Sequence, residues 1–243
     1  MGSETTQGRG LRRPSGLTFG AMAAAAVLAV VFSGEALAGC SDPPGPKVDW
    51  SNCNKVRKSM KGDNFSGAIF NATDLSRSDF LGAKFVKADL TEANLYRARL
   101  NEADLTDAVM IKVEATRANF VKATLTRTKA AKAELLRADF TGAKITESDL
   151  SKAELGRTDF RRSTLERVSF RYSNLARADF RDSRLTALDM TGAYTYRTRL
   201  EGVDLRDVAG LSPIQLELAC GDGATRLPGD LTAPESWPCE VDD

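Results

Sequence analysis

A large apolar side chain at every fifth position constrains this chain more than any other feature. There are 29 such positions between Phe65 and Leu205, and only Ala115, Ala130 and Thr195 lack a large apolar residue. The residue two positions earlier is usually small, and the residue between the two is often Asp or Asn. A period of five fits neither the 3.6-residue period of a helix nor the alternation of a plain strand.

The spacing is explained if three residues of each five are extended and the other two turn a corner. The small residue and the large residue then point to the same side, while the residue between them points outward. Short sides of this kind wind the chain into a coil whose interior face stays unburied until the next coil stacks on it. We therefore predict stacked coils, each adding about 4.8 Å, the ordinary spacing between strands.

A second period, of twenty residues, gives the number of sides in each coil. Similar residues should recur at this interval where one coil stacks on the next. Five of the nine phenylalanines at the large apolar positions fall in one series with this spacing. With four pentapeptides in each coil, 29 repeats give about seven coils and a shaft roughly 35 Å long. The same spacing gives an unbroken series that we call the arginine ladder: Arg77, Arg97, Arg117, Arg137, Arg157, Arg177 and Arg197.

Units such as Ala88-Asp89-Leu90, Ala138-Asp139-Phe140 and Ala178-Asp179-Phe180 resemble the A-(D/N)-L-x-x consensus of the pentapeptide-repeat family. The resemblance covers residues 63–207. It implies an all-β fold, namely a right-handed, four-sided parallel β-helix. We expect local dents or shifted corners where the pattern is interrupted, at Val113, Ala115, Ala130, Leu188, Thr195 and Val203.

The segment before the repeats is typical of a secretory signal. Three arginines precede an apolar stretch over residues 17–32, and Ala36-Leu37-Ala38 offers a small-x-small cleavage site. This stretch is short for a membrane span, so we expect an exported protein, periplasmic or extracellular, with no membrane span in the mature chain. The predicted organisation is a signal peptide (1–38), an N-terminal cap or linker (39–62), the β-helix (63–210), and a capping helix with a disulfide-tied tail (211–243).

Four cysteines lie beyond the cleavage site and flank the repeats as two close pairs. An even number of cysteines outside the cytoplasm indicates disulfides. We expect Cys40 to pair with Cys53 and Cys220 with Cys239, because other pairings would have to cross the whole shaft. A competing interpretation applies to Cys40. The sequence Leu37-Ala38-Gly39-Cys40 resembles a bacterial lipobox, in which the cysteine carries a lipid anchor, and Cys53 would then have no partner.

Both ends of a β-helix need a cap, since open strand edges and a bare core invite other chains to stack there. At the first end Trp50 is a candidate plug over Phe65 and Phe70. At the other end Ser212-Pro213-Ile214-Gln215 has the pattern of a helix start. We expect this helix to run to about Cys220 and to lay Ile214, Leu216 and Leu218 over the last coil.

The arginine ladder can be interpreted in two ways. Seven like charges about 4.8 Å apart repel one another unless they are neutralised. Acidic residues recur two positions after the ladder, as at Asp79 and Asp139, and three positions before it, as at Glu134. A salt-bridge lattice on a solvated face is one interpretation. Recognition of a ligand is the other.

Charge is also uneven along the chain. The segment 157–184 has a local net charge of +4, and the segment 89–107 a net charge of −3, so the two ends could associate head to tail. Arginine favours bidentate contacts with phosphates and carboxylates. We therefore predict a site for an anionic envelope polymer, lipid phosphates or an acidic partner protein at Arg157, Arg161, Arg162, Arg167, Arg171, Arg177, Arg181 and Arg184.

Catalysis is not expected. The chain has no histidine to serve as a general base near neutral pH, and it shows no nucleophile elbow, Walker loop or dinucleotide fingerprint. We expect no metal and no cofactor. Some pentapeptide-repeat proteins are acidic mimics of duplex DNA that bind DNA gyrase. Here, once residues 1–38 are removed, 31 basic residues balance 31 acidic ones, so we expect no such role and no nucleic-acid partner.

The sequence thus predicts an exported, non-catalytic scaffold or protein-interaction module. The alternative is a lipid-anchored envelope protein of the same fold that binds anionic polymers through its arginine-rich C-terminal coils.

Overall fold

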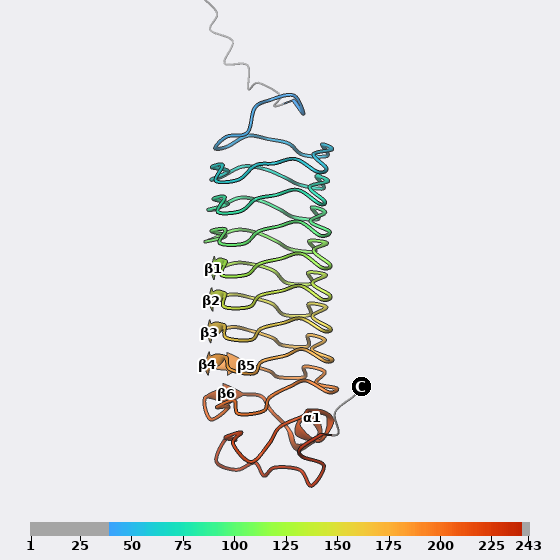
Figure 1. Cartoon of the computed structure of the whole chain (residues 1–243), viewed down its shortest axis with the longest axis vertical. Helices are drawn as coiled ribbons and strands as arrows, with labels where there is room; N and C mark the ends of the chain where they lie inside the picture. Colours follow the sequence, from blue (N-terminus) through green and yellow to red (C-terminus); the bar gives the residue numbers. More distant parts are fainter. Residues whose placement is uncertain (1–38, 240–243) are drawn as a thin grey trace, which may run out of the picture. The chain divides into compact units, whose positions relative to one another are not determined.

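The structure is a computed structural model, and it describes residues 39–239. The predicted signal peptide, residues 1–38, lies outside the described residues. The described chain winds into flat coils stacked along one axis (Figure 1). Residues twenty apart form parallel bridges, from Asp49 with Ile69 to Asp179 with Arg199. The predicted coil of four pentapeptides is therefore confirmed.

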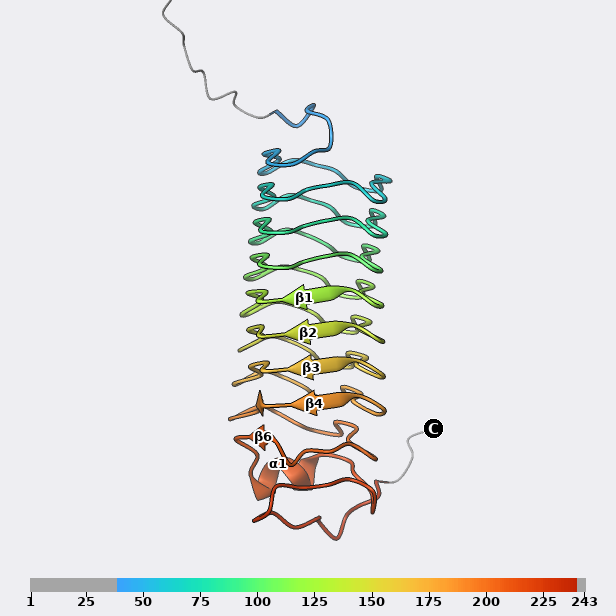
Figure 2. The same ribbon diagram turned by 90° about the vertical axis from the view of Figure 1, so that its left-hand side faces the viewer.

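Few residues form continuous strands, because each side of a coil is only about three residues long. One parallel sheet has the order β1-β2-β3-β4, and its strands lie directly above one another in Figure 2. Each strand pairs with the next at a shift of twenty residues, as Leu125 does with Ile145. The elements are β1 (Thr124–Thr126), β2 (Lys144–Thr146), β3 (Thr164–Glu166), β4 (Arg184–Thr186), β5 (Leu188–Asp189), β6 (Val208–Ala209) and α1 (Pro213–Leu218).

The β-helix begins one coil earlier than the sequence pattern indicates. Trp50 N–H already donates to the carbonyl of Ile69 at 2.8 Å, in the same geometry as later coils. Lys55 occupies an interior position in this first coil and interrupts the apolar series, so the sequence pattern becomes regular only from residue 63. With twenty residues to a coil, residues 48–207 make eight coils rather than seven.

The interior is filled by like residues stacked on like. Phe120 and Phe140 stack with ring centroids 4.6 Å apart and planes 3° from parallel, and the series continues through Phe160 and Phe180 at 5.3 and 4.8 Å. All four rings are fully buried. Stacked contacts of this kind add to the burial of apolar area, so the column is a continuous core with side chains at every level.

The small positions of the interior also accept hydroxyl groups, because each hydroxyl reaches a carbonyl of the coil before. Thr73 Oγ1 donates to the carbonyl of Trp50 at 2.6 Å, and Thr158 Oγ1 donates to that of Leu135 at 3.0 Å. Buried polar groups are tolerated when they are hydrogen-bonded in this way.

Irregular corners occur at only one of the predicted places. The turn is altered after Leu185, next to Leu188, but the chain keeps its ordinary turns around Val113, Ala115, Ala130, Thr195 and Val203. Three further altered turns follow β1, β2 and β3, which the sequence pattern did not indicate. At these levels the small position is enlarged to Thr128, Ser148 and Val168. The four altered corners thus lie in one column, in which the small position is enlarged at four successive levels.

The N-terminal cap combines a disulfide with an aromatic plug. Cys40 pairs with Cys53, with 5.4 Å between their Cα atoms. Trp50 packs against Phe65 and Phe70 at centroid distances of 5.7 and 5.8 Å, as predicted. Lys55 Nζ lies 3.6 Å from the centre of the Trp50 ring and donates to the carbonyl of Cys40 at 2.6 Å, and burial lowers the pKa of this lysine.

The C-terminal cap begins with the predicted helix. Ser212 Oγ accepts from Gln215 N–H while Gln215 Oε1 accepts from Ser212 N–H, a reciprocal capping box. The inward face differs from our expectation. Ile214 is 68% exposed, and the buried residues are Leu216 and Gln215. Gln215 Nε2 donates to the carbonyls of Met190 and Ala193 at 2.8 and 3.0 Å, so a hydrogen-bonded amide fills the place we assigned to Ile214.

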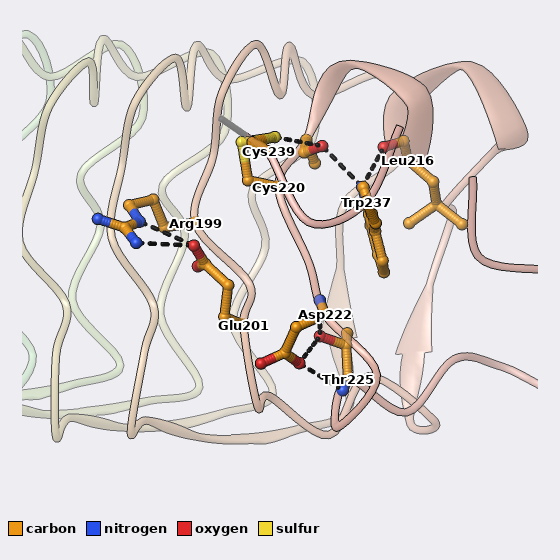
Figure 3. Close-up of a disulfide and its surroundings, with 9 residues drawn as sticks. Arg199, Glu201, Leu216, Cys220, Asp222, Thr225, Trp237 and Cys239 are labelled. Atoms are coloured by element: carbon orange, nitrogen blue, oxygen red, sulfur yellow. Dashed lines mark hydrogen bonds and ion pairs between the residues drawn. A yellow bond between two sulfur atoms is a disulfide. The ribbon is translucent and has the colours of Figure 1, made fainter. Parts of the chain in front are cut away.

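The tail is then drawn back over α1. Cys220 and Cys239 form the second predicted disulfide, with 5.3 Å between Cα atoms. Figure 3 shows Trp237 beside this bond, where its Nε1 donates to the carbonyls of Ala219 and Leu216 at 2.8 and 3.2 Å. The ring lies so close to Gly221 that a Cβ atom there would be 2.2 Å from Trp237 Cζ3.

This contact predicts different outcomes for two nearby glycines. Gly221→Ala should lower the free energy of unfolding by about 1–3 kcal/mol, because the methyl group displaces a packed indole ring. Gly223→Ala is the matched control, since a Cβ at Gly223 meets nothing within 4 Å, and it should change stability by less than about 0.5 kcal/mol. Urea unfolding followed by circular dichroism measures both, and equal effects would contradict the proposed packing.

Candidate functional site

The side chains that leave the shaft lie in columns along its axis. From residue 67 to residue 202, the second corner residue of each pentapeptide adopts a left-handed backbone conformation, with φ between 51° and 60° for the residues other than glycine. Its N–H donates to the next coil, as Arg77 does to the carbonyl of Tyr96 at 2.9 Å and Arg97 to that of Thr116 at 3.1 Å. All seven ladder arginines occupy this position, and Arg57 extends the ladder into the first coil.

Within residues 39–239, the predicted salt-bridge lattice is not formed at the five ladder arginines from Arg77 to Arg157. Asp79 pairs with Lys61 and Arg99 at 3.4 and 3.2 Å, and Asp159 and Asp179 pair with Arg161 and Arg181. These aspartates thus bind a cation of their own column, as with Arg99, or a cation at a first corner position of the same or the preceding coil, as with Arg161 and Lys61.

The ladder arginines have other neighbours. The guanidinium carbons of Arg77 and Arg97 lie 6.0 and 5.2 Å from the ring centre of Tyr96, within cation–π range. Within residues 39–239, Arg117, Arg137 and Arg157 form no ion pair with a carboxylate.

One other corner, in contrast, places opposite charges on successive coils. Along it Arg127 pairs with Asp107 and Arg167 pairs with Glu147, each at 2.7 Å. The hydrogen bond with Asp107 is the main cause of a raised pKa at Arg127. On a further corner Lys112 pairs with Glu92 at 2.8 Å, but Lys132 and Lys152 follow it in the same column. The column of Arg127 thus neutralises itself, whereas the ladder repeats one sign from coil to coil.

The eight arginines of segment 157–184 do not share one face. Arg161, Arg162 and Arg181 follow the interior phenylalanines at 160 and 180, Arg167 follows Leu165, and Arg171 follows Phe170. Arg184 belongs to β4, and only Arg157 and Arg177 lie on the ladder corner. Residues close in sequence travel around the shaft, so the local net charge of +4 is spread over all four corners.

Several of these arginines are also paired within the protein. Arg161, Arg181 and Arg171 bind Asp159, Asp179 and Asp189 at 2.5, 2.6 and 2.9 Å. Hydrogen bonds to these carboxylates raise the pKa of each guanidinium. The pairs are exposed or half-exposed, so each stabilises the fold only weakly.

A depression on the ladder corner is the feature that sequence reasoning missed. It has a volume of about 380 Å³, and its lining comprises Leu136, Arg137, Gly156, Arg157, Asn174, Ala176, Arg177 and Tyr196. The first corner residues of four successive coils form its floor. Leu136 and Tyr196 are 40% and 39% exposed, and the small residues Gly156 and Ala176 lie between them.

The depression could have been found by aligning residues twenty apart outside the interior positions. The series Leu136, Gly156, Ala176, Tyr196 is large-small-small-large in the sequence. The first corner position tolerates all of these because it is exposed. Because the side chains at two of these four levels are small, a hollow forms beside the arginines.

Within residues 39–239, no group of three or more histidine, cysteine, aspartate or glutamate residues could hold a metal ion. None of the helices in this part is both long and apolar enough to cross a membrane.

The chain was compared with known proteins. A family model described as pentapeptide repeats matches in eight copies, over 64–95, 88–127, 118–157, 148–186 and 164–207.

Among solved structures, a trypsin-treated variant of QnrB1, a plasmid-mediated fluoroquinolone resistance protein, has 17% sequence identity and a TM-score of 0.55. The match covers 76% of this chain and 92% of the QnrB1 chain. A pentapeptide repeat protein from the Arabidopsis thaliana thylakoid lumen has 31% identity and a TM-score of 0.40, covering 46% and 77%. No curated protein matches the sequence. The likeness to QnrB1 confirms the right-handed parallel β-helix.

The last coil offers a test of the short-range ion pairs. The Arg206 side chain donates to Asp204 at 2.6 and 2.9 Å, and this hydrogen bond lowers the pKa of Asp204 to about 2 from its usual 3.8. Because the folded-state pKa is depressed, the stabilisation is complete above the usual pKa and is lost as pH falls from about 4 through 2.

Arg206→Gln should raise the pKa of Asp204 towards 3.8, although Asp204 keeps its bond from the backbone N–H of residue 206. Arg226→Gln, which removes the weaker and more distant charge at 3.8 Å, should raise it less. Carboxyl carbon NMR over a pH titration measures both values. A larger shift in the Arg226 variant would mean that this ion pair is misplaced.

Proposed function

Since the chain belongs to the pentapeptide-repeat family, we propose that it is an exported, non-catalytic scaffold that binds a protein partner through the outer faces of its coils. Proteins of this family are generally structural or interaction modules. The observation that carries the proposal is the filled interior. Phe140, Leu155 and the other central side chains are fully buried, so recognition falls to the outward columns.

Export is supported by the two disulfides, which close the caps at both ends of the repeats. Disulfides persist in oxidising compartments and are rare in the cytosol. The signal-like sequence before residue 39 points the same way. Both loops are short, and each closure contributes about 3 kcal/mol under the loop-entropy model.

The lipid-anchored alternative competes for the same sulfur atom. Cys40 cannot be bonded to Cys53 and carry a diacylglyceryl group at once, so their pairing supports the unanchored form. The resistance role of QnrB1 is not extended to this chain. Mimicry of DNA needs a strongly acidic shaft, whereas the chain after residue 38 is neutral and one corner carries stacked arginines.

Mass spectrometry of the mature protein tests the export proposal. We expect a chain that starts at Gly39 and whose mass falls by four hydrogens relative to the reduced form, since two disulfides have formed. A lipid on Cys40 would replace the unanchored scaffold with the anchored one. An uncleaved chain with four free thiols would refute export altogether.

Crosslinking in intact cells tests the binding role. A photoreactive amino acid placed at Leu136, on the exposed ladder corner, should yield a discrete protein adduct. The same amino acid at Val86, on a different corner, is the control and should yield less. Adducts only with copies of the chain itself would instead indicate self-association through this corner, and adducts with envelope polymer alone would favour the polymer-binding alternative.

A further inference from the structure

We propose that the ladder corner around Arg137 and Arg157 is a groove for an extended acidic peptide segment carrying a large apolar side chain. The inference rests on the proposed protein-binding function and assigns it a place and a partner chemistry.

The charge of the corner is the first argument. Successive ladder arginines are one coil apart, about 4.8 Å, and thus line the shaft in a single direction. Within the described chain, Arg137 and Arg157 form no ion pair, while the equivalent Arg127 and Arg167 are each held by a carboxylate of the coil before. Like charges stacked without internal neutralisation are electrostatically unfavourable. An anionic segment lying along the axis relieves this repulsion.

Nearby carboxylates limit the range of the attraction. Glu134 and Glu154 lie three residues before the two arginines, and Glu154 accepts a hydrogen bond from Asn174 at 2.9 Å. The electrostatic attraction of the corner for an anion is therefore weak at long range. Recognition depends on direct contact with the guanidinium groups, which bind carboxylates in a bidentate manner.

The second argument is the apolar character of the depression's floor, which favours a polypeptide over other anionic polymers as the partner. Leu136, Gly156, Ala176 and the Tyr196 ring offer an apolar hollow between and beside the arginines. A polypeptide can fill it with a leucine or aromatic side chain while its acidic residues reach the ladder. Polyphosphate and acidic polysaccharides carry no such group. Tyrosine and arginine around an apolar centre are also the residues that dominate protein–protein binding energies.

Gly156 is the residue that keeps the hollow open. A Cβ atom there would be 3.0 Å from Leu136 Cδ2, so the leucine lies over the glycine. The backbone of Gly156 is not left-handed, and Leu136 and Tyr196 occupy the equivalent position in other coils. A larger side chain is therefore compatible with the fold and fills the depression.

The experiment uses the full mature protein and two fluorescent probes, a short polyglutamate peptide and the same peptide with two central leucines. Anisotropy at physiological ionic strength gives Kd. The leucine-containing peptide should bind at least about tenfold more tightly. Gly156→Leu should remove that advantage and leave binding of the all-glutamate peptide within about twofold.

Charge is tested with a matched pair of double variants. Arg137→Gln with Arg157→Gln should weaken binding of both peptides by about tenfold or more. Arg127→Gln with Arg167→Gln removes two charges at the same backbone position on another corner, and should change Kd by less than about twofold. Circular dichroism of each variant confirms that the β-helix is retained.

Three outcomes would overturn the groove: equal weakening by the two double variants, no effect of Gly156→Leu, or tighter binding of polyphosphate or polygalacturonate than of the leucine peptide. The proposed groove and the proposed scaffold function can be refuted independently of each other. A cellular adduct that survives the Arg137 and Arg157 changes would keep the scaffold role and reject this site. Peptide binding as described without any cellular protein adduct would keep the site and reject the role.

Discussion

Hydrogen bonds between residues about twenty apart are the constraint on which the rest of the molecule depends. Phe120 N–H donates to the carbonyl of Asp139 at 2.6 Å, and Lys122 N–H donates to that of Thr141 at 3.0 Å. The first bond fixes which interior residue stacks on which. The second requires a left-handed corner, a conformation that costs free energy for residues other than glycine. Repeated at every level, these bonds convert a sequence period into columns of equivalent side chains, both inside and outside the shaft.

The arrangement in columns limits where such a protein can bind a partner or carry out chemistry. The interior columns are filled with stacked rings and aliphatic groups, and the ends are closed by Trp50 at one cap and by α1 with Trp237 at the other. Chemistry is thus left to the outward positions, where a residue is surrounded by its counterparts one coil above and below. A column of alternating sign, such as Asp107, Arg127 and Glu147, neutralises itself. In a column of one sign, as at Arg137 and Arg157, the charges are left for a partner.

The ladder corner joins two independent properties of the sequence. Arginine recurs at the second corner position of every coil, and bulk is missing from the first corner position at two adjacent levels. Neither property is required by the β-helix, because both positions are exposed and tolerate many residues. Their coincidence produces charged side chains beside an apolar hollow. This combination distinguishes the corner from that of Asp107, Arg127 and Glu147, whose charges pair between coils.

The sequence alone determined the coil, its four sides and the capping box of α1, because each depends on spacing or on short-range contacts. It also indicated both disulfides, but it left Cys40 open between Cys53 and a lipid anchor. It placed the start of the β-helix one coil late, since Lys55 interrupts the apolar series although the backbone still follows it. It also selected Ile214 over Gln215 as a buried residue of α1. Only the tertiary structure decided where outward side chains meet. Winding places residues that are close in sequence on four different corners and brings together residues that are twenty apart. A long flexible side chain then has several possible partners, and the period of the sequence does not show which of them it contacts.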